Sequence, residues 1–165
     1  MTSYEELLTE AKNGVIIYER NFKSSAKGMY IGSKIGISKS IPTMAEKACI
    51  LAEELGHYLT SYGNILDQSV ASNHKQECRA RAWAYERLVT LDKLISAYET
   101  GIRNWYELSE FLDVTDEFLR EAIKYYKEKY GLYHIIENYI IYFDPLGIYK
   151  KFEQNCKGGA LYGKD

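Results

Sequence analysis

The chain has 165 residues, of which 46% are hydrophobic and 27% are charged, and its formal net charge at pH 7 is −2. This length and composition are typical of one well-packed globular domain with room for a small appendage. A net charge so close to zero provides no general electrostatic attraction to nucleic acid or to an anionic membrane, so neither is an expected partner.

The sequence favours a cytoplasmic location. No stretch reaches the roughly 18 consecutive apolar residues of a membrane span, and residues 1–6 lack the basic and apolar parts of a signal peptide. The three cysteines, Cys49, Cys78 and Cys156, are odd in number and show no C-x-x-C spacing. This pattern argues against a disulfide framework and favours a reducing compartment.

The N-terminal quarter is predicted to hold one helix and a small antiparallel sheet. Ser3 and Glu6 have the spacing of a capping box, and apolar residues at helical spacing follow as far as Gly14. The run 15–18 is typical of a strand, and alternating apolar residues around a Gly-Ser pair predict a hairpin over 28–38. We therefore expect three antiparallel strands before the next helix.

The remainder is predicted to be mostly helical and to close with a hairpin. Thr43, Thr90, Asn104 and Thr115 each stand where a helix N-cap is expected. The predicted helices cover residues 43–63, 73–89, 90–101, 104–112 and 115–130, and the predicted hairpin covers residues 131–146. The fold class is therefore α+β, with the sheet packed on helices.

The sequence predicts two domains and a tail. Residues 1–90 form the first domain, residues 91–153 form a second, and residues 154–165 are expected to be a flexible tail. Within the second domain, residues 105–130 have helix-turn-helix spacing, and the hairpin follows like a wing. Its helices mix acidic and basic residues, whereas a helix that reads DNA usually has a basic face. A protein-docking surface and plain structural packing are both favoured over contact with DNA.

The stretch Glu53-Glu54-Leu55-Gly56-His57 matches the zinc-protease pattern His-Glu-x-x-His at every specified position but the first. Zinc proteases need three protein ligands, an open position for water and a carboxylate that accepts the proton of that water. His57 and Glu54 stand in the positions of a ligand and the base. Glu53 stands where the first histidine would be, on the same helix face as His57. A carboxylate oxygen binds zinc at about 2.0–2.2 Å, so Glu53 is a candidate ligand.

The next predicted helix contains a candidate for the third ligand. Glu77 opens the pattern E-x-x-A-x-x-[aromatic]-A twenty residues after His57. Asp67, between the two helices, is a candidate acceptor for the ring N–H of His57, with a turn residue as the alternative. His74, three residues before Glu77, is a candidate replacement for the missing imidazole, with an exposed residue of the first helical turn as the alternative.

Over residues 4–153 the sequence resembles the ImmA/IrrE family of metallopeptidases, especially its short phage and prophage members. The segments that carry the resemblance are KGMYIGSKIGIS, EKACILAEELGHYLTSYGNILDQS, NHKQECRARAWAYERLV and YELSEFLDVTDEFLREAIKYYKEKYGLY. The resemblance implies a zincin-like fold and a zinc-dependent endopeptidase that cleaves, or triggers loss of, a helix-turn-helix repressor of a mobile element. It also implies that His57 and Glu77 bind zinc and that Glu54 is the general base. The departure from the family motif is Glu53.

Glu53 leaves two functions open. In the first, the chain is an active zinc metallo-endopeptidase, although two carboxylate ligands would make a metal-bound water less acidic and hydrolysis slower. In the second, the chain is a catalytically weakened or inactive relative that binds a repressor through its helical C-terminal part. Without metal, Glu53, Glu54 and Glu77 would lie close together, and at least one of them should have a raised pKa.

Overall fold

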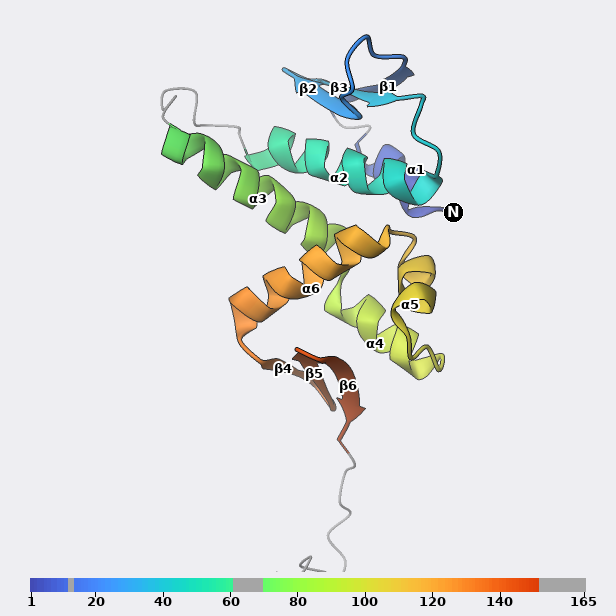
Figure 1. Cartoon of the computed structure of the whole chain (residues 1–165), viewed down its shortest axis with the longest axis vertical. Helices are drawn as coiled ribbons and strands as arrows, with labels where there is room; N and C mark the ends of the chain where they lie inside the picture. The colour runs from blue at the N-terminus through green and yellow to red at the C-terminus, as the bar shows by residue number, and fades with distance from the viewer. Residues whose placement is uncertain (12–13, 61–69, 152–165) are drawn as a thin grey trace, which may run out of the picture.

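The computed structural model describes residues 1–11, 14–60 and 70–151. Within them the chain is α+β, with six helices and two three-stranded sheets (Figure 1). The helices are α1 (Ser3–Glu10), α2 (Met44–Thr60), α3 (Val70–Leu88), α4 (Leu91–Glu99), α5 (Trp105–Leu112) and α6 (Asp116–Tyr130). The strands are β1 (Ile16–Arg20), β2 (Gly28–Ile31), β3 (Lys34–Ser38), β4 (Tyr133–Ile136), β5 (Tyr139–Phe143) and β6 (Leu146–Lys150).

The first sheet is mixed, so the prediction of three antiparallel strands was wrong in one pairing. The hairpin of β2 and β3 is antiparallel as expected, but β3 inserts between the other two strands and pairs in parallel with β1. Burial explains the order, because Ile35 and Ile37 of β3 are fully buried while β1 and β2 contain no buried residue. The most buried strand therefore takes the central position, above α2 (Figure 1).

Helix α1 begins one residue earlier than its predicted capping box. Thr2 and Glu5 form the box, with Glu5 N donating to Thr2 Oγ1 at 3.2 Å and Thr2 N donating to the Glu5 carboxylate at 2.8 Å. Ser3 instead makes a tertiary contact, since its backbone N–H donates to Asp113 Oδ2 at 2.8 Å. The N-terminus is thereby attached to the end of α5, a contact that local sequence spacing does not reveal.

The other predicted caps are confirmed. Thr43, Thr90, Asn104 and Thr115 each accept a hydrogen bond from the backbone N–H three residues later. Helix α3 begins at Val70, three residues before its predicted start. The predicted end of α2 near Gly63 and the predicted tail over 154–165 lie outside the described residues.

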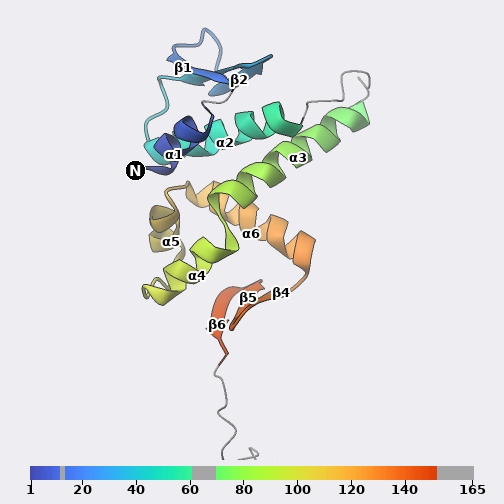
Figure 2. The same cartoon turned by 180° about the vertical axis from the view of Figure 1, so that it is seen from behind.

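The second sheet has three strands where a two-stranded hairpin was predicted. Strand β6 adds to β5 in antiparallel register, and Ile141 and Phe143 of the central strand are buried against the helices. Figure 2 shows this sheet at the end of the molecule opposite the first sheet, with α4, α5 and α6 between it and α2. One hydrophobic core extends from Tyr4 to Phe143 through both regions. The division at residue 90 falls between α3 and α4 and stays a prediction.

None of the described helices is both long enough and apolar enough to cross a membrane.

Candidate functional site

The candidate site lies where α2 crosses α3, and a glycine allows the two helices to meet. Gly56 of α2 faces the main chain of Ala80 on α3, so that a Cβ at Gly56 would lie 3.0 Å from Ala80 Cα and closer still to its carbonyl group. Ala80 is fully buried. The two small residues bring the helix axes close together, and the longer side chains beside them reach across the junction.

His57 and Glu77 meet at this junction. Nε2 of His57 lies 3.2 Å from Oε2 of Glu77, and their side chains are 27% and 41% exposed. The structure therefore brings together two of the residues that the sequence analysis selected as metal ligands. Both remain open to solvent in part, so a dissolved ion can reach them.

The second oxygen of Glu77 is bound by a residue that the sequence analysis did not select. Nε of Arg81 donates to Glu77 Oε1 at 2.9 Å, across one turn of α3. Arg81 and Glu53 both line a neighbouring cavity, where the positive charge of Arg81 opposes the rise in the pKa of Glu53 that burial causes. The only sequence signal for this role is the i, i+4 spacing of an acid and a base.

The carboxyls of Glu53 and Glu54 are half-buried, and the pKa of each is raised. Burial is the larger cause for both, because it disfavours a charged group. It raises the pKa of Glu54 to about 7, with repulsion from Glu53 and Glu77 adding to the shift. Burial also raises the pKa of Glu53, with Arg81 opposing the shift and Glu77 and Glu117 adding to it. The expectation of a raised pKa in this cluster is confirmed, with desolvation rather than crowding as its main source.

Strand β2 lies directly over Glu54. A Cβ at Gly28 would lie 2.6 Å from Glu54 Oε1 and 2.6 Å from Ile50 Cγ2. The backbone of β2 therefore approaches the carboxylate with no side chain between them. Among the described residues β2 pairs with β3 alone, so it is an edge strand of the first sheet.

The remaining candidate within the described residues, His74, does not form a metal-binding group with His57 and Glu77. His74 is exposed on α3, and its Nε2 lies 3.7 Å from Cys78 Sγ, one turn further along the helix. Asp67 lies outside the described residues. Cys49 is buried, and desolvation raises the pKa of its thiol to about 12, as expected for an inert cysteine.

The donor atoms of His57 and Glu77 fit a zinc ion. Two ligand atoms that each lie about 2.0–2.1 Å from a tetrahedral ion are about 3.4 Å apart, and the observed separation is 3.2 Å. No group of three or more His, Cys, Asp or Glu side chains arranged for a metal occurs within 1–11, 14–60 and 70–151. The pair therefore fits two of the ligands of a zinc site, and Glu53, one turn before His57 on α2, does not form a group of three with them in this structure.

One cavity adjoins the junction of α2 and α3, and a second lies away from it, beside the second sheet. The first, of about 410 Å³, is lined from α2, α3 and α6. Its charged residues are Glu53 and Arg81 together with Lys27, Glu46, Glu117 and Glu121. It therefore adjoins the site on the side of Glu53 and has an excess of carboxylates.

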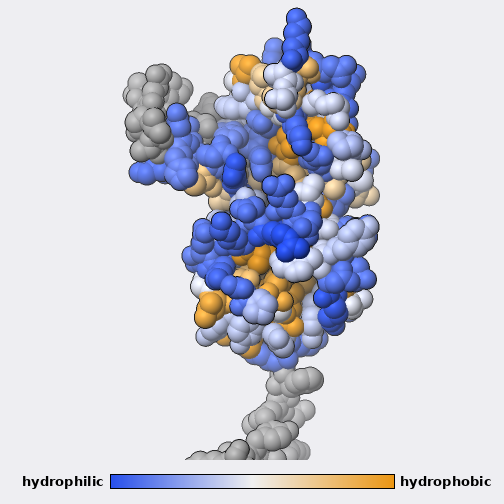
Figure 3. All heavy atoms as spheres, in the orientation of Figure 1, coloured by the Kyte–Doolittle hydropathy of each residue, from blue (hydrophilic) through white to orange (hydrophobic). Residues whose placement is uncertain are grey.

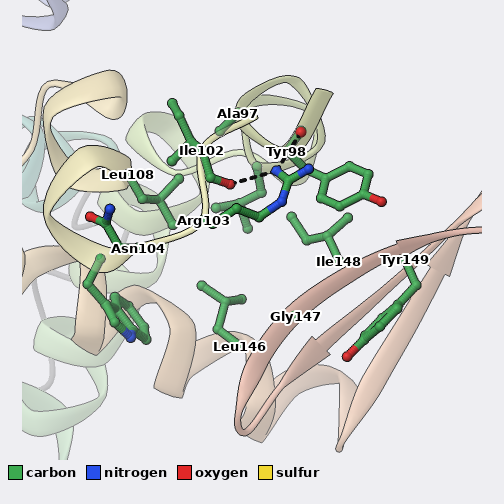
Figure 4. Close-up of a pocket in the computed structure, with 12 residues that line it drawn as sticks. Ala97, Tyr98, Ile102, Arg103, Asn104, Leu108, Leu146, Gly147, Ile148 and Tyr149 are labelled. Carbon is green, nitrogen blue, oxygen red and sulfur yellow. Dashed lines mark hydrogen bonds between the residues drawn. The ribbon is translucent and has the colours of Figure 1, made fainter. Parts of the chain in front are cut away.

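The second cavity, of about 360 Å³, lies between α4, the start of α5 and strand β6. Its walls are mainly aliphatic, and Figure 4 shows Arg103 beside the ring of Tyr98. Nη1 of Arg103 donates to the carbonyl oxygens of Tyr98 and Ile102 at 2.7 and 2.8 Å, and its guanidinium carbon lies 4.3 Å from the centre of the Tyr98 ring. These contacts hold the Arg103 side chain against the wall of the cavity.

Comparison of the chain with protein-family models, with curated proteins and with solved structures gives no match. What can be said of function therefore rests on the residues and their geometry.

Proposed function

We propose that this protein is a zincin-like, zinc-dependent endopeptidase that acts on a helix-turn-helix repressor of a phage or other mobile element. The observation that carries the proposal is the meeting of His57 and Glu77, from separate helices, at a spacing close to that of two zinc ligands. Glu54 lies beside them with a pKa near neutrality. The resemblance to ImmA/IrrE metallopeptidases supports the same assignment and is the source of the repressor as partner.

Each residue has a defined task in this proposal. His57 and Glu77 would hold the zinc ion, Glu53 would have to reorient to become the third protein ligand, and the ion would supply Lewis acidity to water and to a peptide carbonyl. Glu54 accepts a proton from the attacking water and passes it to the leaving amine. A pKa near 7 suits both transfers, because a group that titrates near the working pH can accept and release a proton.

The edge strand β2 supports a peptide as the substrate. An extended chain can pair with the free backbone groups of an edge strand, and such main-chain hydrogen bonds are a common way to hold a peptide. Gly28 brings this strand against Glu54 without an intervening side chain. A peptide aligned along β2 would therefore run past the proposed base.

A second candidate function is repressor binding without proteolysis. It is favoured by Arg81, which engages Glu77, a proposed metal ligand, in a different contact. It is also favoured by the outer face of the second sheet, where Tyr133, Tyr142 and Tyr149 are exposed and adjacent rings lie 5.6 Å apart. Figure 3 shows hydrophobic residues at the surface of both halves of the molecule. Exposed tyrosines are typical of protein contact surfaces.

Metal analysis tests the proposed zinc site. Protein purified without added zinc and then titrated with it should bind about one ion per chain. The His57→Ala and Glu77→Ala variants should lose that ion, and His134→Ala, which removes a histidine from β4, should retain it. Absence of zinc from the wild type, or its retention after His57→Ala, would overturn the site.

Proteolysis is tested separately with Glu54→Gln. This variant keeps the proposed ligands, so it should bind zinc like the wild type and fail to cleave helix-turn-helix repressors in a panel of purified proteins. Repressor inactivation that survives Glu54→Gln would favour the binding function instead. In that case Tyr142→Ser should weaken repressor binding, whereas Tyr106→Ser, at an exposed tyrosine of α5, should not.

A further inference from the structure

Both carboxylate oxygens of Glu77 are already bound in this structure. Oε2 lies 3.2 Å from His57 Nε2, and Oε1 accepts a hydrogen bond from Arg81 Nε at 2.9 Å. Glu77 is therefore held between an imidazole on α2 and a guanidinium on its own helix. A zinc ion bound between His57 and Glu77 would share the Glu77 carboxylate with the guanidinium of Arg81.

Arg81 also acts on Glu53, the carboxylate that stands at the sequence position of the missing histidine. Glu53 and Arg81 line the same cavity, and its other charged residues are mostly glutamates. Its guanidinium donates to Glu77 and lies near enough to Glu53 for the positive charge to act on both carboxyls. Its side chain is 51% exposed, so it can withdraw into solvent at little steric cost.

We propose that Arg81 is an internal counter-ion that competes with the metal for Glu77 and Glu53. This inference rests on the proposed zinc site. In the metal-free protein Arg81 holds the two carboxylates and limits their mutual repulsion. Zinc binding requires Arg81 to give up that contact, so the residue sets the metal affinity without being a ligand or a catalytic residue.

The competition has a measurable cost to zinc affinity. A unit charge and a divalent charge a few ångströms apart repel each other even in a medium close to water, by an amount that corresponds to about tenfold in affinity. Replacing Arg81 with a neutral side chain of similar length should therefore strengthen zinc binding. Replacing it with lysine should not, because the charge is kept.

The experiment is a zinc titration in competition with a chromophoric chelator, with metal-free wild type, Arg81→Gln and Arg81→Lys. The Arg81→Gln variant should bind zinc about tenfold more tightly than the wild type, and Arg81→Lys should stay within about threefold of it. Arg79→Gln, at an exposed arginine of the same helix, controls for the loss of one positive charge. Equal or weaker zinc binding by Arg81→Gln would overturn the inference, and so would equal strengthening by Arg81→Lys or Arg79→Gln.

Thermal unfolding provides a readout that does not depend on activity. Without zinc, Arg81→Gln should unfold at a lower temperature than the wild type, because Glu77 and Glu53 lose their counter-ion. Saturating zinc should raise its unfolding temperature by more than it raises that of the wild type, since ligand binding stabilises in proportion to the logarithm of affinity. A zinc-induced shift no larger than in the wild type would contradict the proposal.

The His57→Ala variant separates this inference from the proposed function. If wild type and Arg81→Gln bind zinc with the same affinity and His57→Ala abolishes it, the zinc site stands and the role of Arg81 is wrong. If neither wild type nor Arg81→Gln binds zinc, the proposed zinc site fails, and the inference fails with it.

Discussion

Gly56 of α2 lies against the main chain of Ala80 of α3 so closely that no Cβ fits between them. The candidate metal ligands lie directly beside this contact. His57 is next to Gly56 in the chain, Glu77 is one turn before Ala80, and the two meet at 3.2 Å across the same junction. The spacing of the candidate ligands is therefore set by a backbone contact between two helices.

Replacing Gly56 with alanine should separate the helices. The added methyl group would press on the carbonyl group of Ala80, which is backbone and cannot turn aside. Overpacking of this kind costs about 1–3 kcal/mol, and only part of that cost is offset by the better helix propensity of alanine. We expect a lower free energy of unfolding in urea and weaker zinc binding. Ser96→Ala, at an exposed position of α4, should change stability by less than about 0.5 kcal/mol.

Glu54→Gln should flatten the dependence of stability on pH in metal-free protein. The carboxyl of Glu54 has a pKa of about 7 in the folded chain and a reference value of 4.5. Because folding favours its neutral form, the stability from this group is fully present below pH 4.5 and is lost as the pH rises through 7. Glutamine resembles the neutral form of the carboxyl. The fall in the free energy of unfolding as the pH rises through 7 should therefore be about 1–2 kcal/mol smaller in the variant, after allowance for solvent screening.

The measurement for Glu54 is urea unfolding across that pH window with a chelator present. Glu53 contributes a slope of the same sign, because its pKa is also raised. The decisive quantity is therefore the difference between wild type and variant. Glu128→Gln, at an exposed position of α6, controls for the loss of one negative charge. Parallel curves for wild type and Glu54→Gln would show that the carboxyl is not desolvated.

Glu53→His should strengthen zinc binding. Position 53 lies one turn before His57, so an imidazole there would face the same side of α2, and imidazole nitrogen suits zinc better than a second carboxylate. We expect an increase on the order of tenfold in affinity, measured by chelator competition. Glu53→Gln removes the same charge without adding a ligand. If the two variants bind zinc equally, position 53 is not aligned with His57 and Glu77.

Tyr126→Phe should weaken the attachment of α6 to the end of α3. The buried hydroxyl of Tyr126 donates to the carbonyl oxygen of Val89 at 2.8 Å. Its removal leaves that carbonyl without this donor and should cost about 1–2 kcal/mol in the free energy of unfolding. Tyr106→Phe makes the same change at a tyrosine that is 69% exposed and should have almost no effect. Equal effects would mean that the hydroxyl of Tyr126 contributes nothing specific.

The helices and their starting points could be read from the sequence for a local reason. A cap at Thr90, Asn104 or Thr115 depends on a side chain and a backbone N–H only three residues apart, so the signal is contained in a few letters. The cap of α1 was misplaced by one residue because Ser3 is used in a contact with Asp113, more than a hundred residues away. Local spacing contains no information about such a contact.

Strand order in the first sheet was decided by burial in the folded chain. The sequence shows that 28–38 forms a hairpin, since the alternation and the turn are both local. It does not show that β3 would sit between β1 and β2, because that depends on which strand faces α2 with two buried isoleucines. The third strand of the second sheet was not predicted, although β6 follows β5 after only Asp144 and Pro145 and pairs with it in antiparallel register.

The sequence by itself determined which residues are available for chemistry: an E-x-x-H pair on one helix and a glutamate on the next, at a spacing that only a helix pair can use. The tertiary structure decided how they are used. It brought His57 to Glu77 through the Gly56–Ala80 contact, desolvated Glu54, and placed Arg81 on Glu77. Periodicity fixes which face of a helix a residue occupies, but the distance between two faces and the burial of a carboxyl are properties of the packed core.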